Sequence, residues 1–238
     1  MPSYLETIIK RWKDQPIIHE NDIDNKMRNF AVLFAYHSNR IEDERITYHD
    51  TRELFINGRV VGFTGDPEIL SAIAGQKLCY EYQKSFIVRK QKIERELILN
   101  IHRELMNATY DDQRCLKGER PGEFKHHDYV VGIHAIGSEP GYLEEINTTE
   151  MNEENFIKIS AYFHGRFEQI HPFADGNGRV GRSLMNYLLM INDFPPIIIH
   201  DEDKPFYYEC LEAFDEKENL EPLILLLQYS MEKTWKNT

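Results

Sequence analysis

The sequence has few cysteines and no long apolar run. Cys79, Cys115 and Cys210 are far apart and form no CxxC pair, so neither a disulfide framework nor a thiolate zinc site is predicted. No stretch reaches the roughly 20 apolar residues of a membrane span, and residues 1–10 lack the apolar core of a secretory signal. These absences favour a reducing compartment, and we expect a cytoplasmic protein without a membrane contact.

Positive charge is also scarce. Lys and Arg total 28 against 40 Asp and Glu, which gives a formal net charge of −12 over 238 residues. A surplus of negative charge opposes an extended contact with nucleic acid, and we expect no nucleic-acid partner. A site for a phosphate-containing ligand must therefore be local. Hydrophobic residues make up 41% of the chain, which is enough for a sizeable core.

Apolar residues recur at helical spacing over most of the chain, without an internal repeat or a Gly/Ser-rich linker. We therefore expect one mainly α-helical domain over residues 1–238, with residues 1–60 as its N-terminal part. The expected helices cover residues 22–41, a segment opening at Asp66 and Pro67, residues 93–105, 152–170 and 180–191, and two segments that begin near Pro205 and Pro222.

One segment has the composition of a strand. Residues 129–136 are rich in β-branched side chains, and Gly137 and the Pro140-Gly141 turn follow them. This pattern predicts a small β-hairpin, or flap, ahead of the C-terminal third.

The most informative segment is HPFADGNGRVGR, residues 171–182, between two expected helices. Gly176 and Gly178 flank Asn177 and allow the backbone to turn tightly, so several N–H groups can point the same way. The following helix presents its unpaired donors and its positive dipole end at the same place. Such a helix N-terminus is suited to binding phosphate.

Four charged or titratable residues of this segment supply matching chemistry. Arg179 and Arg182 lie three positions apart on the first helical turns and can bond phosphate oxygens. Asp175 offers a hard oxygen ligand, which suits Mg²⁺ that bridges phosphates. His171 has an ordinary pKa of about 6.5 and can accept a proton near neutral pH.

The segment matches HPFxDGNGRxxR at every fixed position, and by this signature the chain resembles the Fic (Fido) family of protein adenylyltransferases. The resemblance covers roughly residues 122–227. It implies a Fic-type helical bundle with a catalytic core at about residues 95–228 and a hairpin flap beside the active-site loop. It also implies AMP transfer from Mg-ATP to a Ser, Thr or Tyr hydroxyl of a target protein, and it is compatible with self-modification and a homodimer.

The resemblance assigns roles within the loop. His171 would be the general base, and Asp175 would hold Mg²⁺. Arg182 would hold the γ-phosphate, with Arg179 at neighbouring phosphates. The backbone amides of three residues would form the anion hole: Gly176, Asn177 and Gly178.

Further roles follow from the same resemblance. Tyr207 or Tyr208 would face the nucleoside, although packing within a helix explains these tyrosines equally well. Asp215 stands where the family pattern leads us to expect Asn. A flap would dock the target by strand pairing through these residues: Gly132, Ile133, His134, Ala135, Ile136 and Gly137.

A second pattern lies in SNRIED, residues 38–43, and resembles the family's inhibitory motif [S/T]xxxE[G/N]. Ser38 and Glu42 are four residues apart and share one helical face, from which the carboxylate could reach the γ-phosphate arginine. The resemblance therefore implies autoinhibition by a helix ahead of the catalytic core. Asp43 departs from the motif's Gly or Asn.

Several alternatives remain open at this point. The same scaffold supports transfer of another phosphate-containing group or removal of AMP, and a non-catalytic interaction module is a different class of function. A histidine metallohydrolase would use residues among His126, His127, His134 and His164, but no HExxH spacing occurs. No GxxxxGK[ST] sequence occurs either, which argues against a P-loop NTPase.

Overall fold

The computed structural model describes residues 3–110, 112–127 and 142–236, and within these ranges it contains helices and loops but no strand. The helices are α1 Tyr4–Lys13, α2 Glu20–Glu42, α3 Tyr48–Asn57, α4 Pro67–Val88, α5 Arg95–Met106, α6 Asp112–Leu116, α7 Tyr142–Thr148, α8 Phe156–Ile170, α9 Asn177–Ile191, the 3₁₀ helix η1 Asp201–Asp203, α10 Lys204–Lys217 and α11 Glu221–Thr234. The expected hairpin at residues 129–136 lies outside the described residues.

The strongly periodic segments form the expected helices. α2, α4, α5, α8, α9, α10 and α11 all occur, although α8 begins four residues later than the start expected at residue 152. Asp66 caps α4 as predicted, because its carboxylate accepts the backbone N–H of Glu68 at 3.0 Å. α1, α3, α6 and α7 were not predicted. α3 and α6 have one buried residue or none to set a period, whereas α1 has a capping box from Ser3 and Glu6 and three buried apolar residues, a signal that the sequence reasoning missed.

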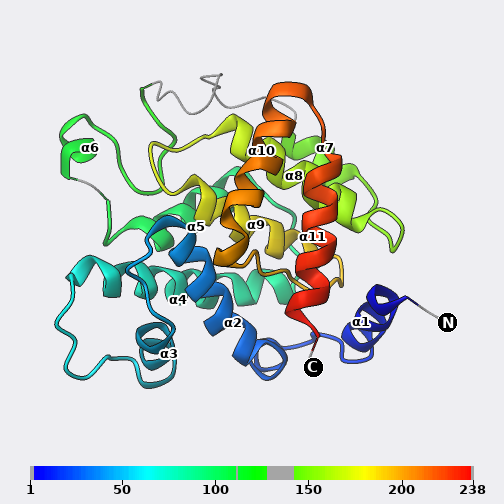
Figure 1. Cartoon of the computed structure of the whole chain (residues 1–238), viewed down its shortest axis with the longest axis horizontal. Helices are drawn as coiled ribbons and strands as arrows, with labels where there is room; N and C mark the ends of the chain where they lie inside the picture. The colour runs from blue at the N-terminus through cyan, green and yellow to red at the C-terminus, as the bar shows by residue number, and fades with distance from the viewer. Residues whose placement is uncertain (1–2, 111, 128–141, 237–238) are drawn as a thin grey trace.

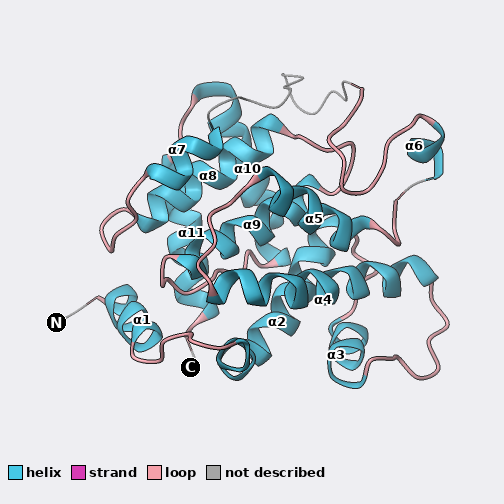
Figure 2. Cartoon of the chain, turned by 180° about the vertical axis from the view of Figure 1, so that it is seen from behind, coloured by secondary structure: helices cyan, strands magenta, loops and turns pink. Residues whose placement is uncertain are grey.

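α9 is the central helix of the fold (Figures 1 and 2), and it contacts α2, α4, α5 and α8. Almost every residue of α9 is buried, including the polar Ser183 and Asn186. A helix surrounded by other helices must be apolar on most of its circumference. Its N-terminus, where the motif lies, is consequently fixed by packing on several sides.

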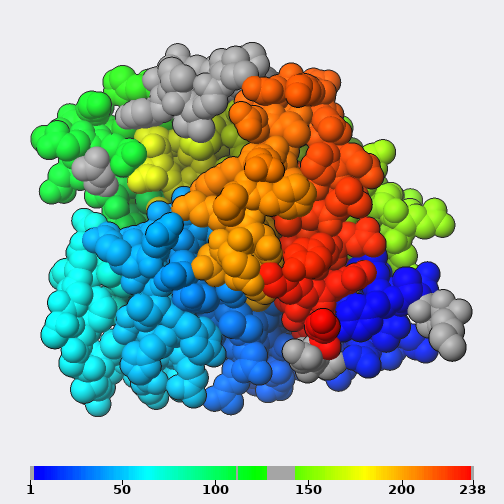
Figure 3. Space-filling model, viewed as in Figure 1, coloured from blue at the N-terminus to red at the C-terminus, as the bar shows by residue number. Residues whose placement is uncertain are grey.

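The two ends of the described chain pack against each other. α1 lies beside α11 on the surface (Figure 3), and Trp12 meets Trp235 edge to face with ring centroids 5.4 Å apart. Phe30 of α2 stacks on the same Trp235 at 5.9 Å. This aromatic cluster anchors the first half of α2 and leaves the other end of α2 to reach the motif.

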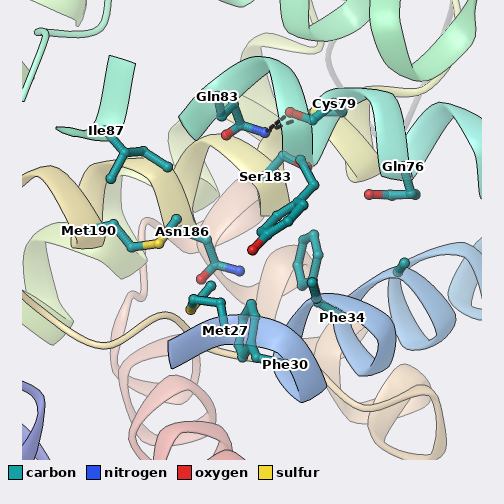
Figure 4. Close-up of a pocket in the computed structure, with 13 residues that line it drawn as sticks. Met27, Phe30, Phe34, Gln76, Cys79, Gln83, Ile87, Ser183, Asn186 and Met190 are labelled. Atoms are coloured by element: carbon teal, nitrogen blue, oxygen red, sulfur yellow. Dashed lines mark hydrogen bonds between the residues drawn. The ribbon is translucent and has the colours of Figure 1, made fainter. Parts of the chain in front are cut away.

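α2 also packs on α4 and α9, and a pocket of about 30 Å³ remains between the three helices (Figure 4). Met27, Phe30 and Phe34 of α2 line one side of this pocket. This volume is far too small for a nucleotide.

Across the described residues, no helix combines the length and the apolar character needed to cross a membrane.

Candidate nucleotide site

The motif forms the connection from α8 to α9. His171 ends α8 in the left-handed region with φ +47°, and Gly176 precedes α9 with φ +76°. The positive φ favours glycine at this position, and a Cβ there would lie 2.5 Å from the Met106 sulfur, so that side chain would have to shift. The two left-handed residues turn the chain sharply enough to bring His171 next to the first turn of α9.

Asn177 holds this loop closed from the inside. Its Oδ1 accepts the backbone N–H of Phe173 at 2.9 Å, and its Nδ2 donates to the carbonyl of Phe173 at 2.8 Å. Both residues are buried, and Phe173 is fully so. The Asn177 side chain therefore points into the protein, and only its backbone amide remains for the anion hole that the sequence predicted.

His171 is arranged as a proton acceptor. Its Nδ1 lies 3.3 Å from the carbonyl oxygen of Glu168, which can only accept, so Nδ1 carries the ring proton. Nε2 consequently presents a lone pair. Burial lowers the pKa of His171, outweighing the opposing effect of its bond to Glu168, and keeps the imidazole neutral at neutral pH.

A cavity of about 640 Å³ opens beside this imidazole, within the 300–1,000 Å³ range of ordinary ligand sites. Its walls bring together several predicted residues: Glu42, His171, Gly178, Arg182, Tyr207, Tyr208 and Asp215. The expected base, the start of α9 and the expected nucleoside-facing helix therefore share one nucleotide-sized space.

Arg182 is buried but not free. Its Nη2 donates to Glu42 Oε1 at 2.6 Å and to the carbonyl of Ser38 at 2.9 Å, and its Nε donates to Ser38 Oγ at 3.1 Å. The arginine predicted for the γ-phosphate is thus bonded to both residues of the predicted inhibitory pattern.

Glu42 lies directly over the first turn of α9. A Cβ added to Gly178 would be 2.6 Å from Glu42 Oε1, so the carboxylate occupies the space that the glycine leaves. Burial opposes ionisation of Glu42, but the positive charge of Arg182 overcomes this effect and lowers the pKa of the carboxyl. The side chain is 35% exposed at the cavity rim. An ionised group therefore sits where a helix N-terminus would hold an anion.

The two carboxylate oxygens of Asp175 have different partners, and one of these partners is exchangeable. Oδ1 accepts the backbone N–H of Gly176 at 2.7 Å, whereas Oδ2 lies 3.1 Å from Nη1 of Arg114 on α6. A carboxylate with one replaceable partner fits the hard-oxygen preference of Mg²⁺. Arg179 also fits phosphate binding, because its Nε is buried and has no hydrogen-bond partner among the described residues.

The two tyrosines differ. Tyr207 is 1% exposed and shares a 2.7 Å hydrogen bond between its hydroxyl and Nε2 of His164, so packing accounts for most of its role. Tyr208 is 43% exposed on the cavity wall and remains a candidate for the nucleoside.

Sequence reasoning missed Glu168, another residue of the cavity wall. Burial raises the pKa of this carboxyl to about 8. Its position three residues before His171 was the available signal.

The histidines considered for a metallohydrolase form no metal site among the described residues. His126 and His127 pair with Glu123 and Glu119, respectively. His134 lies outside the described residues. The part of the chain that the structure describes contains one group with ligand-like spacing, His37, Asp201 and Glu202. Arg40 and Lys233 already pair with the two carboxylates of this group.

Comparison with known proteins agrees with this geometry. Residues 92–189 match the family model described as Fic/DOC family. The chain contains a Fic/DOC domain. "Protein adenylyltransferase Fic" of Drosophila persimilis is 30% identical over 227 residues, which are 91% of this chain and 43% of that protein. Its Drosophila mojavensis counterpart is 31% identical over 207 residues, 84% of this chain and 39% of that protein.

Solved structures show the same Fic fold. Fic-1 (residues 134–508) from C. elegans superposes with a TM-score of 0.75 at 21% identity, covering 97% of this chain and 69% of that one. A Fic domain-containing signaling protein from Bacteroides thetaiotaomicron gives 0.71 at 21% identity, covering 99% and 98%. The chain thus spans less than half the length of these curated relatives but nearly all of the bacterial structure.

Proposed function

We propose that this Fic protein transfers AMP from Mg-ATP to a Ser, Thr or Tyr hydroxyl of a target protein. The observation that carries the proposal is the cavity that His171 and Gly178, in the first turn of α9, line together. A base and an anion-binding helix end around one nucleotide-sized cavity suit nucleophilic attack on a phosphate. The names of the curated relatives support the choice of AMP.

In the proposed reaction, His171 accepts the proton of the target hydroxyl at Nε2. The hydroxyl oxygen forms a bond to the α-phosphorus of ATP, the bond from that phosphorus to the bridging oxygen breaks, and pyrophosphate leaves. The backbone amides of residues 176–178 and the guanidinium groups of Arg179 and Arg182 hold the phosphates and stabilise the negative charge that develops on them.

Asp175 is the residue that would hold Mg²⁺. When bound, this ion neutralises phosphate charge and orients the phosphates. Asp175 would have to exchange the guanidinium of Arg114 for the ion, because that group is 3.1 Å from its Oδ2.

We also propose that α2 inhibits this reaction. The Glu42 carboxylate neutralises Arg182 and fills the space beside Gly178, so a γ-phosphate at this position would meet a negative charge instead of a free arginine. ATP must displace Glu42 to bind productively. A target-docking role for residues 132–137, a homodimer and a cytoplasmic location remain part of the proposal.

ATP labelled either at the α-phosphate or at the γ-phosphate tests the proposed reaction with three proteins: wild type, Glu42→Gly and Glu42→Gly/His171→Ala. We expect the α-label to appear on protein. Its amount should be at least about tenfold higher in Glu42→Gly than in wild type, and no label should appear in the double variant. Glu44→Gly is the matched control, because this exposed glutamate lies two residues away. Transfer of γ-label alone would reject AMP transfer, and equal labelling of wild type and Glu42→Gly would reject inhibition.

A further inference from the structure

His102 of α5 lies outside the sequence motif but is buried against it. Its side chain is 0% exposed, and its ring stacks on Phe173 with centroids 3.8 Å apart and planes within 4°. An apolar ring would serve this stacking alone, and burying two ring nitrogens is costly unless both are hydrogen-bonded. The nitrogens of His102 therefore require an explanation of their own.

The partners of the two nitrogens fix the tautomer. The backbone N–H of Gly122 can only donate, and it lies 2.8 Å from Nδ1, so Nδ1 is unprotonated. Nε2 carries the ring proton and lies 3.1 Å from the backbone carbonyl oxygen of Asp175, which can only accept. The imidazole is a neutral bridge between residue 122 and the motif loop.

The hydrogen bond from His102 holds the peptide group that links Asp175 to Gly176. This peptide plane contains both the carbonyl that His102 holds and the N–H of Gly176 that donates to Asp175 Oδ1 at 2.7 Å. Because the peptide group is planar, rotating it would displace the carbonyl and the amide together. Holding the carbonyl therefore fixes the carboxylate orientation as well.

The geometry points to His102 as a positioning residue. Its Nε2–H holds the carbonyl of Asp175 and thereby keeps the carboxylate in the orientation that binds the divalent cation of a nucleotide. Partners that orient a metal ligand in this way usually change metal affinity by about 10- to 100-fold when they are mutated. The inference rests on the proposed function, because the cation site is part of it.

Two amide substitutions separate the two bonds of His102. In His102→Gln, the introduced amide nitrogen takes the place of Nε2 and can still donate to Asp175. In His102→Asn, the introduced amide oxygen takes the place of Nδ1 and can accept only from Gly122. Both variants lose the stacked ring, so a purely structural role predicts similar effects.

Both substitutions are made in the Glu42→Gly protein, which is the parent for comparison. The probe is Mn²⁺ with ATP. Free Mn²⁺ is followed by electron paramagnetic resonance, and stability is followed by thermal unfolding.

We expect His102→Gln to bind Mn²⁺–ATP within about threefold of the parent and His102→Asn to bind about tenfold more weakly or worse, with similar losses of thermal stability. Equal weakening in both variants, while the parent binds, would overturn the inference alone. Failure of the parent to bind Mn²⁺–ATP would overturn the proposed function and this inference with it.

A measurement on the unmodified chain covers the case in which the variants do not fold. Long-range ¹H–¹⁵N correlation spectra report which imidazole nitrogen is protonated. We expect His102 as the neutral Nε2–H tautomer. Observation of the Nδ1–H tautomer would overturn the inference, because Nε2 could then not donate to Asp175.

Discussion

The motif loop and the C-terminal end of α2 meet at the start of α9, but they are held there in different ways. The loop is fixed by backbone bonds and by fully buried side chains, including both bonds from Asn177 to Phe173. The end of α2 is held by side-chain bonds between Arg182 and Ser38 or Glu42, and Glu42 is 35% exposed. The bonds from Asn177 that close the loop are buried, whereas the proposed inhibitory contact includes one partly exposed partner, Glu42, which a ligand in the cavity could reach.

The sharpest test of the loop concerns His171, which combines a left-handed backbone with the proposed base. His171→Ala and His171→Asn should both lower label transfer about 100-fold or more, because neither side chain accepts a proton. Alanine should also destabilise the fold by about 1 kcal/mol, whereas asparagine tolerates positive φ. The assay is α-label transfer in the Glu42→Gly background, with thermal unfolding in parallel. Activity retained in His171→Asn would show that the backbone, rather than the base, is essential.

The rigidity of the loop predicts a large effect on stability at Asn177. Asn177→Ala removes two bonds and leaves the N–H and C=O of Phe173 without that partner, so we expect a loss of about 2–3 kcal/mol in equilibrium urea unfolding. Asn192→Ala is the matched control at the other end of α9, where one bond to Leu188 is lost. A loss no greater than that of the control would contradict the account of the loop.

The next expected effect concerns Glu168, which lines the cavity together with His171 of the motif loop and Glu42 of α2. Its pKa of about 8, raised from 4.5 chiefly by burial, means that the folded state binds a proton more strongly than the unfolded state. The associated stability is fully present below pH 4.5 and is lost as pH rises towards 8 and just beyond. Between about pH 6.5 and 8.5 we expect a loss of about 1–2 kcal/mol that Glu168→Gln removes.

Equilibrium unfolding at the two pH values measures this difference. Glu209→Gln, an exposed substitution on the same cavity wall, should leave the loss unchanged. An unchanged pH dependence in Glu168→Gln would show that this carboxyl titrates near its ordinary range.

The smallest expected effect concerns Ser38 at the end of α2. Ser38→Ala removes the hydroxyl that accepts from Nε of Arg182, but the bonds to the Ser38 carbonyl and to Glu42 remain. The hydroxyl also accepts from Nε2 of Gln76 at 3.3 Å, and its bond from Arg182 is charge-assisted. Because Arg182 keeps its two other bonds, we expect label transfer to rise only about two- to fivefold, which corresponds to about 0.4–1 kcal/mol. Ser85→Ala, which removes a longer Ser–Arg contact on α4, should cause no change. A rise as large as that of Glu42→Gly would mean that the serine, not the carboxylate, holds α2 in place.

The sequence by itself determined the long helices and the motif loop. The helices depend on a repeat of apolar residues, and the loop on glycines and polar residues at fixed spacing within twelve positions, so both are local properties. The short helices α3 and α6 escaped prediction because at most one of their residues is buried, whereas the capping box and buried apolar residues of α1 were a usable local signal.

Only the tertiary structure decided which distant groups meet the loop. His102 and Arg114 reach the loop from two different helices, across 73 and 61 positions in sequence, whereas the meeting of Glu42 with Arg182 was expected from the family resemblance. No periodicity encodes such meetings, since they depend on how helices pack around α9. The tertiary structure also turned the Asn177 side chain inward and left its backbone amide to face the site, because burial requires the amide group to find partners.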